Sequence, residues 1–295
     1  MKILAPVNFG DASAAVVAFA YGLAGHLGAR LRVAHVHQVV DDPAYDGLRA
    51  SANAALSNRL HELVHRACGK SDAEVVVEAV SLDANPVTGI TTLAREADLV
   101  VIGQTESHGV WRFMLGDTTA AVIEHARTPV LVVPAGYAFS PPDSLNVVVE
   151  GAWPPPAYAN PLRYLARHFD ARLEIFRVVA SDTPRGSRDE EADEVAAFAY
   201  GLPHAYHVAG RREVLFEYLT SSLDRLETTW LCAFHHPRSA WQRAMTRTFE
   251  ERLAAIAPLP TLILVDAEQP NALAELLATA TDRSITPAPA DAAGA

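Results

Sequence analysis

The chain has 295 residues, half of them hydrophobic and a fifth charged, so it can bury one large core or two of ordinary domain size. Its formal net charge of −11 and the lack of a long Lys or Arg run argue against a nucleic-acid partner. The two cysteines, Cys68 and Cys232, form no Cys-x-x-Cys pair, and the start MKILAPVNFG is too short and polar for a signal peptide or a membrane span. We therefore expect a cytoplasmic protein without a membrane span.

The first 139 residues alternate between short apolar runs and segments with helical periodicity. Strands are expected at 3–7, 31–37, 75–77, 99–102 and 130–133, and helices at 13–27, 48–69, 86–97 and 117–125. Asn85 followed by Pro86 favours a helix start, because the Asn side chain can accept from free amides and Pro at the first helical position needs no donor. Helices between nearly all strands predict right-handed crossovers and a parallel sheet covered on both faces.

The same pattern begins again after a Pro-containing linker at 138–143. Strands are expected at 145–149, 173–179, 206–208, 230–233 and 261–265, and helices at 161–168, 190–200, 213–226 and 239–256. Trp111 and Trp241 lie 130 residues apart, and this offset indicates a duplicated domain. We predict domains at 1–139 and 140–267 and a partly disordered C-terminal tail at 268–295. The fold class is α/β, with two tandem Rossmann-like domains, each a mostly parallel five-stranded sheet covered by helices on both faces.

Two segments and the order of the elements resemble the universal stress protein family. The segments are the opening ILAPVNFGDAS and the later stretch VVIGQTESHGVWRFMLGDTTAAVIEHARTPVLVV. The second half matches in order and length, but its loop CAFHHPRSAWQRAMTRTFEE keeps none of the family glycines. The resemblance covers about residues 1–266 and implies a tandem form of the adenine nucleotide α-hydrolase-like fold.

The resemblance also implies a nucleotide loop, because many members bind ATP through Gly, two residues, Gly, nine residues, Gly-Ser. Glycines let the backbone approach phosphates, and the helix that follows offers free amides. In this chain Gly103 and Gly116 occupy the first and last glycine positions, Glu106 replaces the middle glycine, and Asp117 replaces the serine. Asn8 stands where ATP-binding members commonly carry Asp.

These departures predict a degenerate nucleotide site. A carboxylate about 4 Å from a phosphate costs roughly 4 kcal/mol at an effective dielectric constant of 20, and Glu106 and Asp117 add two. Asp117 at a helix start would also cap its own helix and occupy amides that a phosphate needs. We therefore expect no resident cofactor, while ATP with Mg²⁺ bridging these carboxylates stays open.

Other side chains give weaker signals. His35 and His37 share one face of a strand, but no third ligand is identifiable, so no metal site is expected. No Gly-x-Ser-x-Gly elbow accompanies the serines, so no catalytic residue is assigned. Trp153, followed by three prolines, can line a cleft or fasten its loop onto the domain.

The sequence favours a non-catalytic stress-response or regulatory protein with eroded ATP-binding motifs. Two alternatives are an ATP-binding protein with slow hydrolysis in the first half, and a carrier of a small or apolar ligand between the halves. The expected partners are an unknown protein and a second copy in a homodimer. Within the chain, the last strands at 130–133 and 261–265 should pair as in a pseudo-dimer, because unpaired apolar edge strands promote aggregation.

Overall fold

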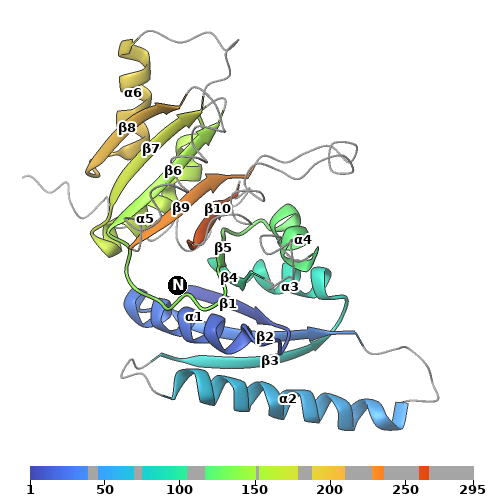
Figure 1. The fold of residues 1–295 in the computed structure, drawn as a ribbon. Helices are drawn as coiled ribbons and strands as arrows, with labels where there is room; N and C mark the ends of the chain where they lie inside the picture. Colours follow the sequence, from blue (N-terminus) through green and yellow to red (C-terminus); the bar gives the residue numbers. More distant parts are fainter. Residues whose placement is uncertain are drawn as a thin grey trace, which may run out of the picture.

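The computed structural model describes residues 1–38, 46–69, 75–104, 117–150, 153–178, 188–209, 228–235 and 259–265. Within these residues, strands and helices alternate along the chain and build one extended sheet with helices packed against it (Figure 1). The architecture is therefore the α/β class that the sequence predicts.

The first half contains five parallel strands and four helices among the described residues. Its elements are β1 (Lys2–Val7), α1 (Ser13–Leu27), β2 (Arg30–His37), α2 (Asp46–Cys68), β3 (Val77–Asp83), α3 (Pro86–Ala94), β4 (Leu99–Gly103), α4 (Asp117–His125) and β5 (Val130–Val133). Strand β3 differs from the expectation of a strand at 75–77, because it begins at Val77 and continues to Asp83. It lies at the end of the sheet, and its residues are only half-buried or exposed, so they lack the apolar run that marks a central strand.

The described part of the second half begins with the same alternation, and its helices α5 and α6 are shorter than α1 and α2. Its elements are β6 (Ser144–Glu150), the 3-10 helix η2 (Pro156–Ala159), α5 (Asn160–Phe169), β7 (Arg172–Val178), α6 (Arg188–Ala199), β8 (His204–Ala209), β9 (Thr229–Phe234) and β10 (Thr261–Leu264). Strand β4 begins at Leu99 and β9 at Thr229, which is the offset of 130 found in the sequence. The helices predicted at 213–226 and 239–256 and the tail at 268–295 lie outside the described residues.

The two halves share a single ten-stranded sheet. The strand order is β3-β2-β1-β4-β5-β10-β9-β6-β7-β8, and neighbouring strands within each half are parallel. At the centre, β5 and β10 pair antiparallel, with Val130 opposite Ile263 (Figure 1). The strand pairing expected between 130–133 and 261–265 is therefore present.

The core is divided into two layers by the sheet. On one face the apolar side chains of the strands pack against α1, α2, α5 and α6. On the other face they pack against α3 and α4. Strand β1 shows the alternation, because Ile3 and Ala5 belong to the first layer and Leu4 to the second. The sheet is thus covered on both faces in the first half.

Trp230 on β9 lies at the centre of an aromatic cluster that joins the halves. Its ring centroid is 5.9 Å from that of Phe19 on α1, 5.2 Å from Phe169 on α5 and 6.5 Å from Phe139 in the connecting segment. The side chain is fully buried. A Cβ on Gly22 would lie 2.8 Å from Phe139, so this glycine lets the connecting segment lie directly against α1. The cluster therefore fixes α1, α5 and the connection to one another.

We predict that Trp230→Ala lowers the free energy of unfolding by about 3–5 kcal/mol, because it leaves a large cavity in this cluster. Trp230→Phe should cost less than half as much, since it keeps most ring contacts and removes an indole N–H that is buried without an acceptor. Urea denaturation followed by circular dichroism measures both. Equal losses for the two variants would contradict a packing role for the ring.

Candidate functional site

A cleft opens at the switch point of the first-half sheet, where the strand order changes direction between β1 and β4. Strand β1 pairs with β2 on one side and with β4 on the other, and in such sheets ligands bind beyond the carboxyl ends of the strands at this point. The cleft has a volume of about 520 Å³. It is lined by Pro6, Val7, Asn8, Gly10, Asp11, Ala12, Ser13, Val16, Val36, Pro86, Ile90, Ile102, Gly103, Gln104, Thr118 and Thr119.

Asn8 lies in this cleft, at the turn between β1 and α1. Its Oδ1 accepts a hydrogen bond from the Gly10 N–H at 2.9 Å and one from the Ser13 hydroxyl at 3.3 Å. Phe9, between Asn8 and Gly10, has a left-handed backbone conformation with φ of 60°. The side chain of Asn8 therefore holds a tight turn, which is a common use of Asn, and its oxygen is occupied within the protein.

Gly103 also lines the cleft, at the end of β4. A Cβ at this position would lie 2.6 Å from Cγ2 of Val16 on α1, so only glycine allows β4 and α1 to approach this closely. The Gly103 carbonyl accepts a long hydrogen bond of 3.4 Å from the Thr119 hydroxyl on α4. The structure thus gives Gly103 a packing role that needs no phosphate.

The other predicted loop residues are only partly covered by the structure. Glu106 and Gly116 lie outside the described residues. Asp117 is the first residue of α4, and its side chain is not among those described, so its capping role stays a prediction. The structure therefore brings Asn8, Gly103 and the start of α4 together at one cleft.

The charge of the cleft comes from one side chain among its described lining residues. Asp11 carries a carboxylate, and no Lys, Arg or His lines the cleft within the described part of the chain. The remaining polar groups are neutral hydroxyls and amides from Asn8, Ser13, Gln104 and the threonines of α4. This lining is suited to an uncharged or cationic ligand more than to an anion.

An apolar wall faces these polar groups. It is built by Pro86 and Ile90 of α3 with Val36 of β2 and Ile102 of β4. Helix α3 begins as predicted, because Asn85 Oδ1 accepts from the N–H groups of Val87 at 3.1 Å and Thr88 at 3.3 Å, and Pro86 occupies the first turn. The sequence identified this cap but gave no sign that the helix would line a cleft.

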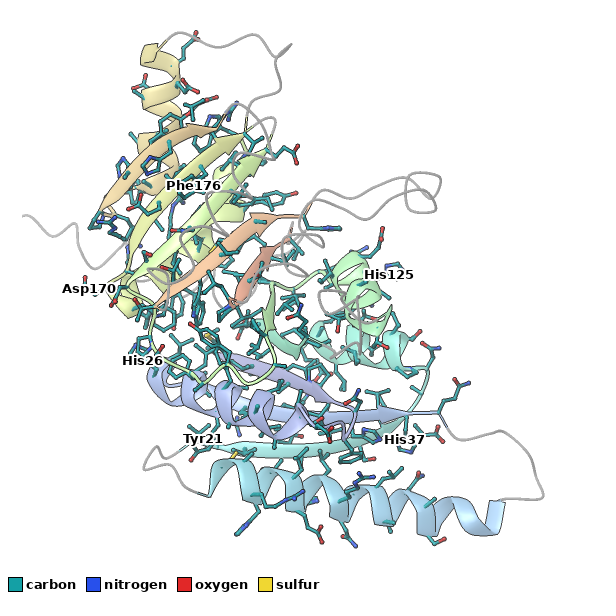
Figure 2. The ribbon with its side chains drawn as sticks, viewed as in Figure 1. Tyr21, His26, His37, His125, Asp170 and Phe176 are labelled. Carbon is teal, nitrogen blue, oxygen red and sulfur yellow. The ribbon has the colours of Figure 1, made fainter. Side chains whose placement is uncertain are left out.

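His35 and His37 form a stack beside the cleft. Their ring centroids are 5.4 Å apart and nearly parallel. The His35 ring is 2.9 Å from the Val7 carbonyl through Nδ1, and His37 Nε2 is 2.9 Å from Asn53 Oδ1 on α2. Figure 2 labels His37 near the end of β2. Among the residues that the structure describes, no three His, Cys, Asp or Glu side chains gather as a metal ligand set would.

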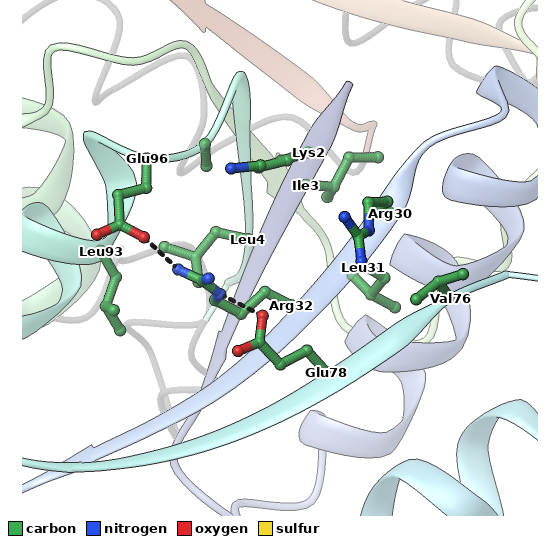
Figure 3. A pocket seen from close by; sticks show the side chains of 11 residues that line it. Lys2, Ile3, Leu4, Arg30, Leu31, Arg32, Val76, Glu78, Leu93 and Glu96 are labelled. Carbon is green, nitrogen blue, oxygen red and sulfur yellow. Dashed lines mark hydrogen bonds and ion pairs between the residues drawn. The ribbon is translucent and has the colours of Figure 1, made fainter.

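A second cavity, of about 320 Å³, lies at the opposite ends of the strands (Figure 3). Arg32 crosses it and donates to Glu78 at 2.8 Å and to Glu96 at 2.7 Å. The hydrogen bond from Arg32 lowers the pKa of Glu96, and the two carboxylates raise the pKa of Arg32. These charges are already paired with one another, so the cavity has the features of a structural ion-pair network.

Only the start of the equivalent loop in the second half lies among the described residues. Ala233, which replaces the first glycine, is buried in β9, and the N–H of the buried His235 donates to the Leu264 carbonyl at 2.7 Å. The rest of this loop, including His236, lies outside the described residues. Trp153 packs against Phe198 and Tyr206, so it fastens its loop onto the domain, as one of the two predicted roles requires.

These features define a doubly wound α/β protein with a cleft at its switch point. The model of the universal stress protein family matches residues 1–134. A universal stress protein of Methanocaldococcus jannaschii is 31% identical over 140 residues, which are 45% of this chain and 81% of the relative. The chain belongs to the universal stress protein family.

Solved structures show that the same fold extends over nearly the whole chain. A universal stress protein from Archaeoglobus fulgidus covers 90% of this chain and 96% of its own, with a TM-score of 0.65 and 14% identity. A protein of unknown function from Pseudomonas aeruginosa covers 94% of this chain and 97% of its own, with a TM-score of 0.55 and 15% identity. Across the described residues, no helix is both long and apolar enough to span a membrane.

We predict that His35 makes the protein less stable as the pH falls. Burial, and then repulsion from His37 and Arg59, lowers the pKa of His35 below its usual value, although its hydrogen bond to Val7 opposes this. Below about pH 6.5 the unfolded chain therefore takes up a proton that the folded chain refuses, and the free energy of unfolding declines until the lowered pKa is reached. Well above about pH 6.5, the contribution of His35 to the free energy of unfolding is constant.

Urea denaturation at about pH 7.5 and about pH 5.5 tests this prediction. His35→Gln keeps a donor for the Val7 carbonyl and should reduce the loss of stability on acidification. His61→Gln, at an exposed position of α2, serves as the matched control and should leave the loss unchanged. An identical pH dependence in His35→Gln and the parent chain would show that another group is responsible.

Proposed function

We propose that this universal stress protein is a non-catalytic, regulatory protein whose first-half cleft has lost tight binding of ATP. The observation that carries the proposal is the charge of the cleft. Its described lining contains the carboxylate of Asp11 and no cationic side chain, whereas a triphosphate is a polyanion. Glu106 and Asp117 add two further carboxylates in the sequence of the loop. Each of them opposes a phosphate unless a metal ion intervenes.

The turn between β1 and α1 supports the same proposal. The N–H of Gly10 donates to Asn8 Oδ1, and the N–H of Ser13 donates to the Gly10 carbonyl at 3.0 Å. Backbone donors of this kind could otherwise receive an anion. In this chain they are engaged within the turn, which leaves fewer free donors at the mouth of the cleft.

The described nucleophiles give no support for catalysis. The hydroxyl of Ser13 donates to Asn8 and has no histidine partner among the described residues. Burial raises the pKa of the Cys68 thiol to about 11 and also raises that of Cys232, so both thiols are protonated near neutral pH. We infer that the protein acts by binding, in the reducing cytoplasm where two unpaired cysteines are stable.

A second candidate function is the binding of a small, uncharged ligand in this same cleft. The volume of about 520 Å³ is within the range of small-molecule sites, and such sites combine an apolar wall with a few polar groups. The sequence placed such a ligand between the halves. The cleft instead lies within the first half, between the ends of β1 and β4 and the helices α1, α3 and α4.

We predict that the double change Glu106→Gly and Asp117→Ser raises the affinity for Mg-ATP by at least about tenfold, because it removes two carboxylates from the loop. The expected stability cost is about 1 kcal/mol or less, since Ser caps a helix nearly as well as Asp. Calorimetric titration of the parent and the variant with Mg-ATP measures the change.

The matched control is Glu62→Gln with Asp143→Asn, which changes the net charge equally at exposed positions outside the cleft. It should leave the affinity for ATP unchanged. Micromolar binding by the parent chain would instead favour the alternative of an ATP-binding protein that uses Mg²⁺. No gain in the double variant would show that these two side chains are not what closes the site.

For the second candidate, we predict that an uncharged small molecule is released when the purified protein is denatured and extracted. Thr118→Trp, at the exposed rim of the cleft, should remove this molecule by filling the space. Thr92→Trp, on an exposed part of α3 outside the cleft, should not. Mass analysis of the three extracts decides the question, and identical extracts would contradict a ligand in this cleft.

A further inference from the structure

Arg177 and Trp153 form a buried group of hydrogen-bond donors in the second half. Trp153 follows the end of β6, and Arg177 is the penultimate residue of β7. Arg177 lies in register with Val149 of β6 and Val208 of β8. Both side chains are therefore at the carboxyl ends of their strands, the edge at which sheets of this class bind ligands.

Three N–H groups at this place have no acceptor among the described residues. Nε and Nη1 of Arg177 and Nε1 of Trp153 are all buried, and none has a hydrogen-bond partner. A guanidinium and an indole N–H can only donate, so they cannot satisfy one another. Buried donors without acceptors are uncommon in folded proteins and are unfavourable, above all when they carry a charge.

The surroundings hold the two side chains in place without neutralising the charge. The Arg177 guanidinium lies over the Trp153 ring, with Cζ 5.0 Å from its centroid. The nearby carboxylate of Glu191 accepts from the Tyr206 hydroxyl at 2.6 Å. Within the part of the chain that the structure describes, no carboxylate forms an ion pair with Arg177. The cation thus lies against the Trp153 ring without an ion-pair partner among the described residues.

The first half shows the same arrangement with its donor satisfied. There His35 of β2 lies in register with Val7 of β1, as Arg177 of β7 does with Val149 of β6. Phe9, from the turn after β1, packs against the His35 ring with a centroid distance of 4.1 Å. The His35 Nδ1 is 2.9 Å from the Val7 carbonyl. The second half has a longer, permanently charged side chain at this position, and its buried Nε and Nη1 have no such acceptor.

We propose that Arg177 and Trp153 bind an oxyanion group, the carboxylate or phosphate of a small ligand, in the second half. Such a group supplies the acceptor atoms and negative charge that these donors lack, and it can accept a charge-assisted hydrogen bond from Nε or Nη1 of the guanidinium. The indole N–H supplies a third donor. This site is independent of the cleft in the first half and of any ATP binding there.

Calorimetric titrations with inorganic phosphate and with acetate, at constant ionic strength set by chloride, test the proposal on the full chain. Saturable binding of phosphate alone indicates a phosphate-bearing ligand, and binding of acetate alone indicates a carboxylate. Arg177→Met should weaken the binding by at least about tenfold, because it removes the charge and all donors. Trp153→Phe, which removes the N–H with the pyrrole part of the indole and keeps an aromatic ring, should weaken it by about threefold or more.

Arg95→Met, at an exposed position of the first half, is the matched control and should bind as the parent does. A second readout concerns stability without added oxyanion. Arg177→Met should unfold at the same or a higher temperature than the parent, because it removes two buried N–H groups that have no acceptor among the described residues. If Arg177→Met does not fold, two other variants still test the site. Arg177→Lys keeps the charge but removes the guanidinium N–H groups, and Trp153→Phe removes the indole N–H. No saturable binding of either anion, or binding that both site variants retain in full, would overturn the proposal.

Discussion

The antiparallel pairing of β5 with β10 is the interaction on which the whole architecture depends. Each strand is the last of its half, and every residue in both is buried. Left unpaired, each would expose a row of backbone N–H and C=O groups beside apolar side chains. By pairing, they satisfy these groups together and convert two half-sheets into one sheet. The fully buried Trp230 on the neighbouring β9 then packs α1, α5 and the connecting segment around the joint.

Within this frame, the two halves use equivalent positions for different chemistry. At the end of the second strand of each half, a nitrogen-bearing side chain packs against an aromatic side chain from the turn after the first strand. In the first half the protein itself satisfies that side chain, and the adjacent cleft is lined by neutral groups and one carboxylate. In the second half Nε and Nη1 of Arg177 have no acceptor among the described residues. We therefore expect the halves to differ in the charge of what they bind.

Packing explains two of the glycines in this chain. Gly103 matches the nucleotide loop, yet a Cβ there would meet Val16. Gly89 behaves in the same way on α3, where a Cβ would lie 2.5 Å from Val36. A glycine at the first position of the loop is thus explained by the approach of helix and strand, and it carries little information about ATP.

The sequence by itself determined the strands, most helices, the duplication and the Asn85 cap, because these follow from local periodicity and from contacts between near neighbours. It misplaced β3, whose half-exposed position at the end of the sheet leaves no apolar run to detect. Only the tertiary structure decided that Asn8 Oδ1 accepts from the N–H of Gly10 and that α3 lines the cleft. It also decided that Arg177 lies over the Trp153 ring, with Nε and Nη1 lacking an acceptor among the described residues. These properties depend on residues far apart in the chain, whose separation and orientation are set by strand register and packing rather than by local pattern.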